Sequence, residues 1–276
     1  MRSNNPVLSK PDAWQSGTAT GQYAQYPGQQ AQGQPYQGQY PGQPSDFGPG
    51  NQPVQAGRMT IDDVITKSAI TMGTLMAVAA LTFLFLPKTL LLPAAIVGAL
   101  VSFGVVMLVS FRRQINPAFV LAYAAIEGVF IGAISKVYEM AWNGIVPAAV
   151  MGTLVAAAAT LAAYKFFRIR VTNKFRKMVM IGTIAYAGVL FVNFILSMFG
   201  VNFLFGGGTS LPLLLAISAL GVGLAVFNLI LDFDYIEQGV AMGASAQESW
   251  RAAFGLTVTM VWLYTNILRI LSYIRR

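Results

Sequence analysis

The 276-residue sequence contains no cysteine and no histidine. The lack of cysteine excludes disulfide bonds and thiolate metal sites. The lack of histidine removes the commonest metal ligand and the usual general base near neutral pH. Catalysis by a Ser-His-Asp or Cys-His arrangement is therefore excluded, and any response to pH must come from carboxylates. We expect no enzymatic activity and no bound cofactor.

Charged residues are also scarce, because they make up 10% of the chain against 55% for hydrophobic residues. Soluble domains carry about 25% charged residues. So few charges cannot cover a water-exposed globular surface, so most of the chain must face lipid or itself. The formal charge of +8 comes mainly from cations in the connecting segments. Such a pattern is typical of membrane topology rather than of nucleic-acid binding.

The N-terminal segment has a different composition from the rest of the chain. The sequence Tyr-Pro-Gly-Gln begins at Tyr26 and again at Tyr40, among glycine, glutamine and proline residues. Such a segment has almost nothing to bury, so we expect residues 1–57 to form a disordered tail before a membrane bundle over 58–276. The tail acts either as a solvated tether or as a tyrosine-rich segment that binds a protein partner. It lacks the pattern of a secretory signal.

Long uncharged stretches predict the membrane spans. Order is expected to begin at Thr60, whose hydroxyl stands three residues before Asp63, as in a capping box. A span needs about 20 apolar residues. Stretches of that length with at most an isolated charge occupy 68–87, 89–111, 114–135, 140–164, 178–231 and 252–274. The fifth stretch is long enough for two spans with a turn at 205–212. The sequence therefore predicts an all-α bundle of seven transmembrane helices.

The distribution of lysine and arginine predicts the orientation. Arg112 and Arg113 separate the second and third spans, and six cations lie between Lys165 and Lys177. The segment between the fifth and sixth spans has no charge. Basic loops stay in the cytoplasm, so we expect a cytoplasmic N-terminus and, with seven spans, an external C-terminus. Two basic residues at the C-terminus favour the alternative, in which the last segment is re-entrant.

Two ionisable residues lie inside predicted spans. A bare carboxylate at Glu127 would cost a few kcal/mol in lipid, so Glu127 must be protonated, paired or facing water. We expect Arg269, in the last span, to neutralise it; the alternative is that Arg269 snorkels to the interface. Gly128 and Gly132 follow Glu127 one helical turn apart, a spacing that favours close packing against a neighbouring helix.

Asp232 and Asp234 close the sixth span. They are some 200° apart around a helix, so one should face the bundle and the other the cytoplasmic boundary. The pattern does not decide which. Carboxylate oxygens suit calcium, and acidic groups along a helical pore favour cations. An intramembrane aspartyl protease would need its two aspartates on different helices, and this pair shares one.

Three features together resemble the Bax inhibitor-1-like family, in a bacterial branch with an extended tail. They are the stretch from Glu127 to Ser135, the aspartate-bearing end of the sixth span, and the Leu263-Tyr264 pair. The resemblance implies six helices around a central seventh in a bacterial plasma membrane. It also implies a pH-sensitive calcium leak gated by two aspartates, one on the sixth and one on the seventh span. At the seventh-span position this chain has Asn266.

Two functions are consistent with these features. The first is a calcium or cation leak channel in ion homeostasis or stress response, with Asp232, Asp234, Glu127 and Asn266 as candidates for the ion pathway or for pH sensing. No metal ligand set is assigned, and calcium enters only as a transported ion. The second is a non-conducting membrane protein that regulates a stress response or a protease, which the tail favours.

Overall fold

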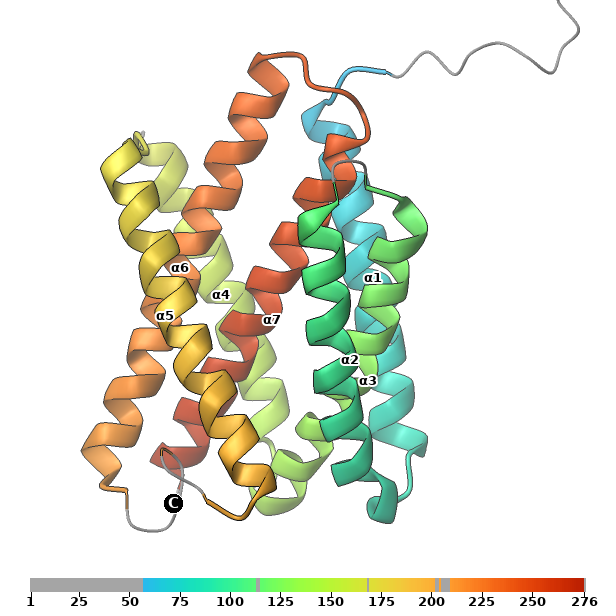
Figure 1. Cartoon of the computed structure of the whole chain (residues 1–276), viewed down its shortest axis with the longest axis vertical. Helices are drawn as coiled ribbons and strands as arrows, with labels where there is room; N and C mark the ends of the chain where they lie inside the picture. Colours follow the sequence, from blue (N-terminus) through green and yellow to red (C-terminus); the bar gives the residue numbers. More distant parts are fainter. Residues whose placement is uncertain (1–56, 113–114, 168, 202–203, 205–208, 276) are drawn as a thin grey trace, which may run out of the picture. The chain divides into compact units, whose positions relative to one another are not determined.

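The computed structural model describes residues 57–112, 115–167, 169–201, 204 and 209–275. It contains α1 (Ile61–Phe85), α2 (Leu91–Phe111), α3 (Pro117–Ala141), α4 (Ile145–Phe166), α5 (Asn173–Met198), α6 (Leu211–Ala241) and α7 (Glu248–Ile274), with a short 3₁₀ turn, η2 (Lys88–Leu90), before α2 (Figure 1). All seven α-helices are long and apolar enough to cross a membrane. The predicted seven-helix membrane bundle is confirmed, and α7 is one uninterrupted helix. The predicted tail lies outside the described residues, apart from Gly57.

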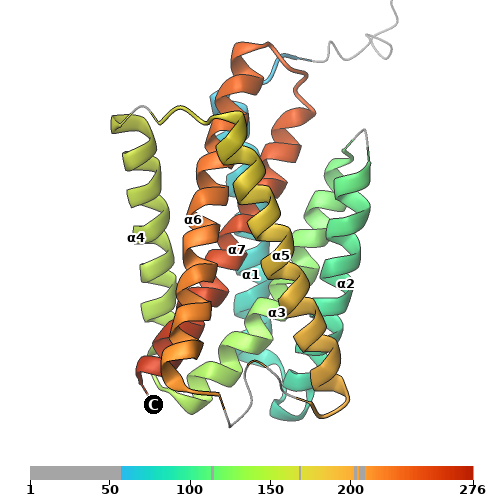
Figure 2. The ribbon, with the colours of Figure 1, turned by 60° about the vertical axis from the view of Figure 1, so that its left-hand side comes forward.

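The helix α7 lies in the middle of the bundle (Figures 1 and 2). Its backbone packs against α1, α3, α4 and α6. Side chains connect it to the two remaining helices, because Phe254 belongs to a cluster with Val109 of α2, and Trp262 stacks on Tyr186 of α5. The arrangement therefore has six helices around a central seventh, as the resemblance implied.

Polar side chains begin several helices. Thr60 accepts a hydrogen bond from the Asp63 backbone N–H at 3.1 Å, so the predicted capping interaction forms. Asn116 and Thr172 cap α3 and α5 in the same way. The N-terminus of α4 is capped by the preceding helix, because the Glu139 carboxylate accepts from the Val146 N–H at 2.9 Å.

Two helices are longer than the uncharged stretches predicted. α3 continues through Lys136 to Ala141, so the predicted start of the fourth span at Met140 is wrong. The Lys136 ammonium donates a hydrogen bond to the Leu86 carbonyl, just after α1, at 2.9 Å, so it has a polar partner within the protein. The chain turns at Gly144, where φ is +77°, a conformation that favours glycine. Likewise, α6 continues beyond its aspartates to Ala241.

The glycines after Glu127 form the contact between α1 and α3. A Cβ atom at Gly128 would lie 2.7 Å from the Leu75 carbonyl oxygen, and one at Gly132 would overlap the Ala79 carbonyl oxygen. Only glycine allows the two backbones to approach so closely. This seam fixes the depth of α3, and with it the depth of Glu127.

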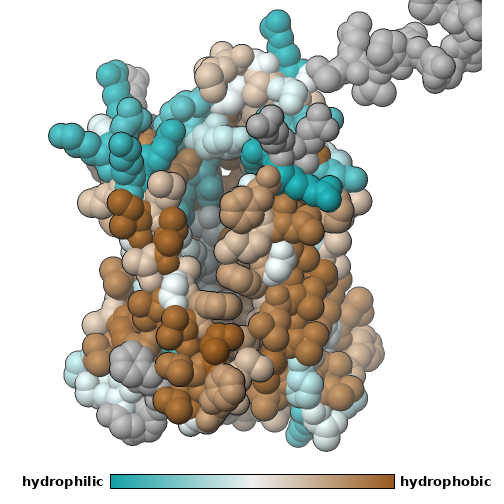
Figure 3. Space-filling view, in the orientation of Figure 1, coloured by the Kyte–Doolittle hydropathy of each residue, from teal (hydrophilic) through white to brown (hydrophobic). Residues whose placement is uncertain are grey.

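The seven crossings give the bundle two chemically different ends. We call the end that holds the α2–α3, α4–α5 and α6–α7 connections the basic end; its described cations are Arg58, Lys67, Arg112, Lys165, Arg170, Lys174, Arg176, Lys177 and Arg251. The opposite end holds Leu86, Gly144 and Arg275. Figure 3 shows a broad apolar belt between the two ends, and hydrophilic side chains gathered at the basic end. A belt of this kind fits a multi-pass membrane protein.

Candidate functional site

Asp232 lies in the half of the bundle nearer the basic end, and its side chain points to α7. One carboxylate oxygen accepts a hydrogen bond from the Thr259 hydroxyl at 2.6 Å. The other lies against Gly255, where a Cβ atom would be 3.3 Å away. Gly255 and Thr259 are four residues apart, so they share one face of α7. A glycine that makes room and a hydroxyl that donates together position this carboxylate.

This carboxylate borders a pocket of about 390 Å³ between α2, α6 and α7. The polar side chains in its wall are those of Ser110, Asp232, Tyr235, Arg251 and Thr259. The rest of the wall is aliphatic or aromatic, with Val106, Val109 and Phe254 among its members. Figure 3 shows this face hollowed between α2 and the helices α5 and α6.

A hydrogen-bonded group of side chains stands where the pocket approaches the basic end. The Tyr235 hydroxyl donates to the Glu248 carboxylate at 2.6 Å, and the same carboxylate pairs with the Arg251 guanidinium at 3.1 Å. Because Glu248 balances Arg251, the formal charge of this group is zero. Asp232 is therefore the acidic side chain of the pocket wall that has no basic partner among the described residues.

Asp234 faces a different neighbour, as the 200° separation predicts. Its carboxylate forms an ion pair with Arg176 of α5 at 2.8 Å and accepts a hydrogen bond from Gln238. Its side chain is buried, whereas that of Arg176 is half exposed. The sequence leaves open which of the two aspartates faces the interior of the bundle. In the structure, Asp232 lines the pocket, whereas Asp234 connects α6 to α5.

Glu127 is buried on α3 beside the Ser102 hydroxyl of α2. The expected pair with Arg269 is not formed. α3 and α7 both start at the basic end, and their register is fixed by the Tyr123–Phe254 ring contact. At 1.5 Å per residue, Arg269 lies about 20 Å further along α7 than Phe254, whereas Glu127 is one turn beyond Tyr123. The two charges are at different depths, with Arg269 nearer the opposite end.

Asn266 also lies nearer the opposite end than the aspartates. Its side-chain oxygen accepts a hydrogen bond from the Tyr186 hydroxyl at 2.9 Å, and both groups fill the space over Gly221 of α6. Thr259, the partner of Asp232, precedes Asn266 by seven residues, or about 10 Å of helix. The seventh-span position of the resemblance therefore does not meet either aspartate of α6.

Glu127, Asp232 and Asp234 also do not gather into a metal site. Across the part of the chain that the structure describes, no three acidic, histidine or cysteine side chains converge on a point where they could hold a metal ion. The pocket therefore offers one carboxylate, with hydroxyl groups beside it.

The sequence interpretation did not identify several residues that shape the site. Thr259 and Gly255 position the carboxylate of Asp232, and Arg176 forms an ion pair with Asp234. A Gly-x-x-x-Thr spacing in the last span was the available signal for the first two. The sequence analysis used Arg176 only as one of the loop cations that predict the orientation. Nothing in the neighbouring sequence marks it as an ion-pair partner.

Comparison with known proteins identifies the family of this chain. The family model described as Bax inhibitor 1 like matches residues 5–276, which is nearly the whole chain. No curated protein matches the sequence. The match covers all seven helices, including the central α7 and the aspartate-bearing end of α6. The chain is therefore a member of the Bax inhibitor 1 like family.

Proposed function

We propose that the protein is a cation leak pathway, with calcium among the conducted ions, and that Asp232 is the cation-attracting group of its cytoplasmic half. The observation that carries the proposal is an unbalanced carboxylate in the wall of a 390 Å³ pocket within an apolar bundle. Carboxylate and hydroxyl oxygens are the ligands that hard cations prefer. A protein with this role needs no enzymatic chemistry and no resident cofactor.

The orientation that we propose puts the pocket on the cytoplasmic side. The basic end carries most of the described lysine and arginine residues, and such loops stay in the cytoplasm. Asp232 would therefore attract cations that enter from the cytoplasmic side of a bacterial plasma membrane. The N-terminus would be cytoplasmic and the C-terminus external.

Beyond Asp232, the described conformation supports a closed pathway. Tyr186 stacks on Trp262 with ring centroids 5.7 Å apart, and Asn266 is hydrogen-bonded to the same tyrosine. A second stack joins Phe103 of α2 to Phe191 of α5. These contacts lie on α5, which packs its backbone on α6 alone. We propose that movement of α5 opens the pathway, because among the described helices its backbone packs against α6 and its other contacts are made by side chains.

The direct test is a flux measurement on the full-length protein in vesicles that contain a calcium-sensitive dye. The proposal predicts calcium flux above that of protein-free vesicles, and more flux from Tyr186→Ala than from the unmodified protein because the aromatic barrier is removed. Lack of flux from both proteins, each shown to be folded and inserted, would contradict conduction. It would favour the alternative of a non-conducting regulatory membrane protein.

A further inference from the structure

A second cavity, of about 350 Å³, lies on a different face of α7 from the Asp232 pocket. Its walls are α1 and α4, and α3 and α7 form its floor. The backbones of α1 and α4 are not packed against each other, so the groove separates them. Met76 and Leu154, at its edges, are 60% and 54% exposed. The groove is therefore open to the medium that surrounds the bundle.

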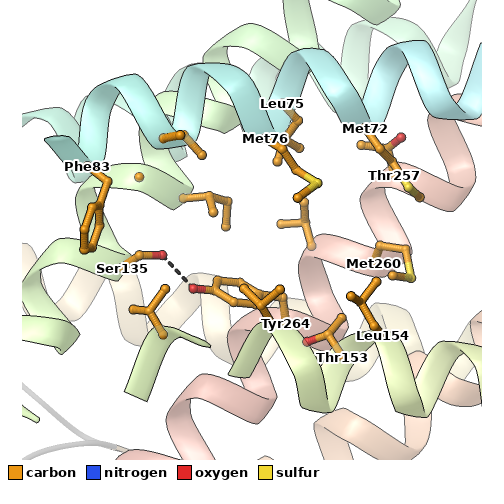
Figure 4. Close-up of a pocket in the computed structure, with 17 residues that line it drawn as sticks. Met72, Leu75, Met76, Phe83, Ser135, Thr153, Leu154, Thr257, Met260 and Tyr264 are labelled. Atoms are coloured by element: carbon orange, nitrogen blue, oxygen red, sulfur yellow. Dashed lines mark hydrogen bonds between the residues drawn. The ribbon is translucent and has the colours of Figure 1, made fainter. Parts of the chain in front are cut away.

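The polar groups in the groove are already satisfied within the protein. The hydroxyls of Ser135 and Tyr264 bond to each other at 2.7 Å, as the dashed line in Figure 4 shows. Thr153 and Thr257 each donate to the backbone carbonyl four residues earlier in their own helix. The remaining lining residues are apolar. Because each polar side chain in the groove has a hydrogen-bond partner inside the protein, the groove suits a hydrocarbon ligand.

The position of the groove relates it to one leaflet of the membrane. It follows α1 from Met72, next to the middle of that helix, to Phe83, next to its end; Figure 4 shows these two residues at opposite ends of the cavity. Eleven residues of helix are about 17 Å long, or roughly half of a 30 Å hydrocarbon core. On α4 the groove begins at Val146, one residue into the helix. It therefore spans the leaflet at the opposite end.

We propose that this groove holds one acyl chain of a phospholipid from the leaflet at the opposite end. The chain would enter beside Phe83 and end near Met72 and Met260. Three facts support this occupant: the groove lies at hydrocarbon depth, its length matches one leaflet, and its polar groups are satisfied internally. Methionine side chains adapt to flexible apolar ligands. The bound chain fills the space between α1 and α4, which the protein itself leaves open.

The test uses the full-length protein in phosphatidylcholine vesicles that contain a photoreactive lipid with a diazirine at the end of its acyl chain. After illumination, adducts are located by peptide mass spectrometry. The proposal predicts adducts concentrated at Met72, Met76 and Met260. A second lipid, with the diazirine next to the ester group, should shift the adducts towards Phe83. Adducts spread evenly over the exposed faces of the helices would show ordinary surrounding lipid and would overturn the proposal.

A pair of matched variants separates a filled groove from a general effect of bulk. Ala80 lines the groove, whereas Ala77 is exposed on the same helix outside it. Ala80→Trp should lose most of the groove adducts, and Ala77→Trp should keep them. Ala80→Leu is a milder replacement in case the tryptophan variant does not fold, and it should reduce the adducts partly. Equal labelling of folded Ala80 and Ala77 variants would refute the proposal.

Discussion

Replacement of Asp232 by asparagine removes the unbalanced charge of the pocket with little change in its shape. The asparagine oxygen can still accept the hydrogen bond from Thr259, and the space over Gly255 is unchanged. A hydrogen bond to a charged group contributes roughly 1 kcal/mol more than one to a neutral group. The new side chain is easier to remove from water than a carboxylate, which offsets that loss. We therefore expect a change in stability within about 1 kcal/mol.

The effect on cation binding should be much larger. Two unit charges 4 Å apart attract each other by about 1 kcal/mol in bulk water and about 4 kcal/mol at an effective dielectric constant of 20. A divalent ion doubles both values. Even the smaller product, about 2 kcal/mol, corresponds to roughly a 30-fold change in occupancy. At calcium concentrations well below saturation, Asp232→Asn should therefore lower the flux by at least about tenfold.

The assay is the initial rate of dye signal in vesicles at a series of low calcium concentrations. The matched control is Asp234→Asn, because Asp234 lies two residues away and is occupied by Arg176 at 2.8 Å. Arg176 is half exposed and can be hydrated when its partner is removed, so this change should cost about 1 kcal/mol or less. The control should retain most of the flux. The thermal midpoint of each detergent-purified variant verifies that both are folded.

Two results would refute this reasoning. Unchanged flux in Asp232→Asn would show that the carboxylate in the pocket does not attract the conducted ion. A larger loss in Asp234→Asn than in Asp232→Asn would show that the pathway follows α5 and α6 instead of α6 and α7.

Three further predictions follow from the geometry of the bundle. Asn143→Cys should react with an impermeant thiol reagent added outside intact cells, and Asn173→Cys should not, because these two exposed positions lie at different ends of the bundle. The reverse reactivity would mean that the proposed orientation is inverted. Gly132→Val should cost several kcal/mol or prevent folding, measured by thermal unfolding, because its side chain would overlap the α1 backbone; a stable variant would show that the α1–α3 seam can separate. Glu127→Gln and Arg269→Met should change stability additively in a double-mutant cycle, because the two residues lie at different depths. A coupling energy above about 1 kcal/mol would instead show that the two side chains form an ion pair.

The number and type of helices could be predicted because lipid allows so few backbone structures. Uncharged stretches near 20 residues have to be helical, since every backbone polar group must be satisfied inside the span. The hydroxyl of Thr60 and the glycines at 128 and 132 act locally, so their roles follow from spacing. The helix ends were less predictable. Lys136 and Glu139 interrupt the uncharged pattern, yet both lie within α3, where their side chains form hydrogen bonds with backbone groups.

The candidate site was only half predictable because it depends on contacts between distant segments. The spacing of Asp232 and Asp234 established that they face different ways, but their neighbours determine which one faces the pocket. Those neighbours, Thr259 and Arg176, are 27 and 58 residues away in the sequence. The pair of Glu127 with Arg269 was wrong for a related reason. A position within an uncharged stretch is a poor measure of depth when the helix extends well beyond that stretch.

The two halves of the bundle differ in a way that determines the expected response to pH. At the basic end, Asp232 provides a negative charge beside water-accessible polar groups, whereas Asn266 and its aromatic neighbours occupy the half at the opposite end. The resemblance implies a latch made of two acids, which acidification could open. Here the seventh-helix position is an amide, and it lies about 10 Å from the level of Asp232. Protonation therefore has no such latch to release, and at Asp232 it acts by removing the charge of the pocket. We expect the calcium flux to fall as the pH on the cytoplasmic side is lowered, and the flux of Asp232→Asn to lose most of this dependence; a flux that rises on acidification in both proteins would place the proton-sensitive group elsewhere.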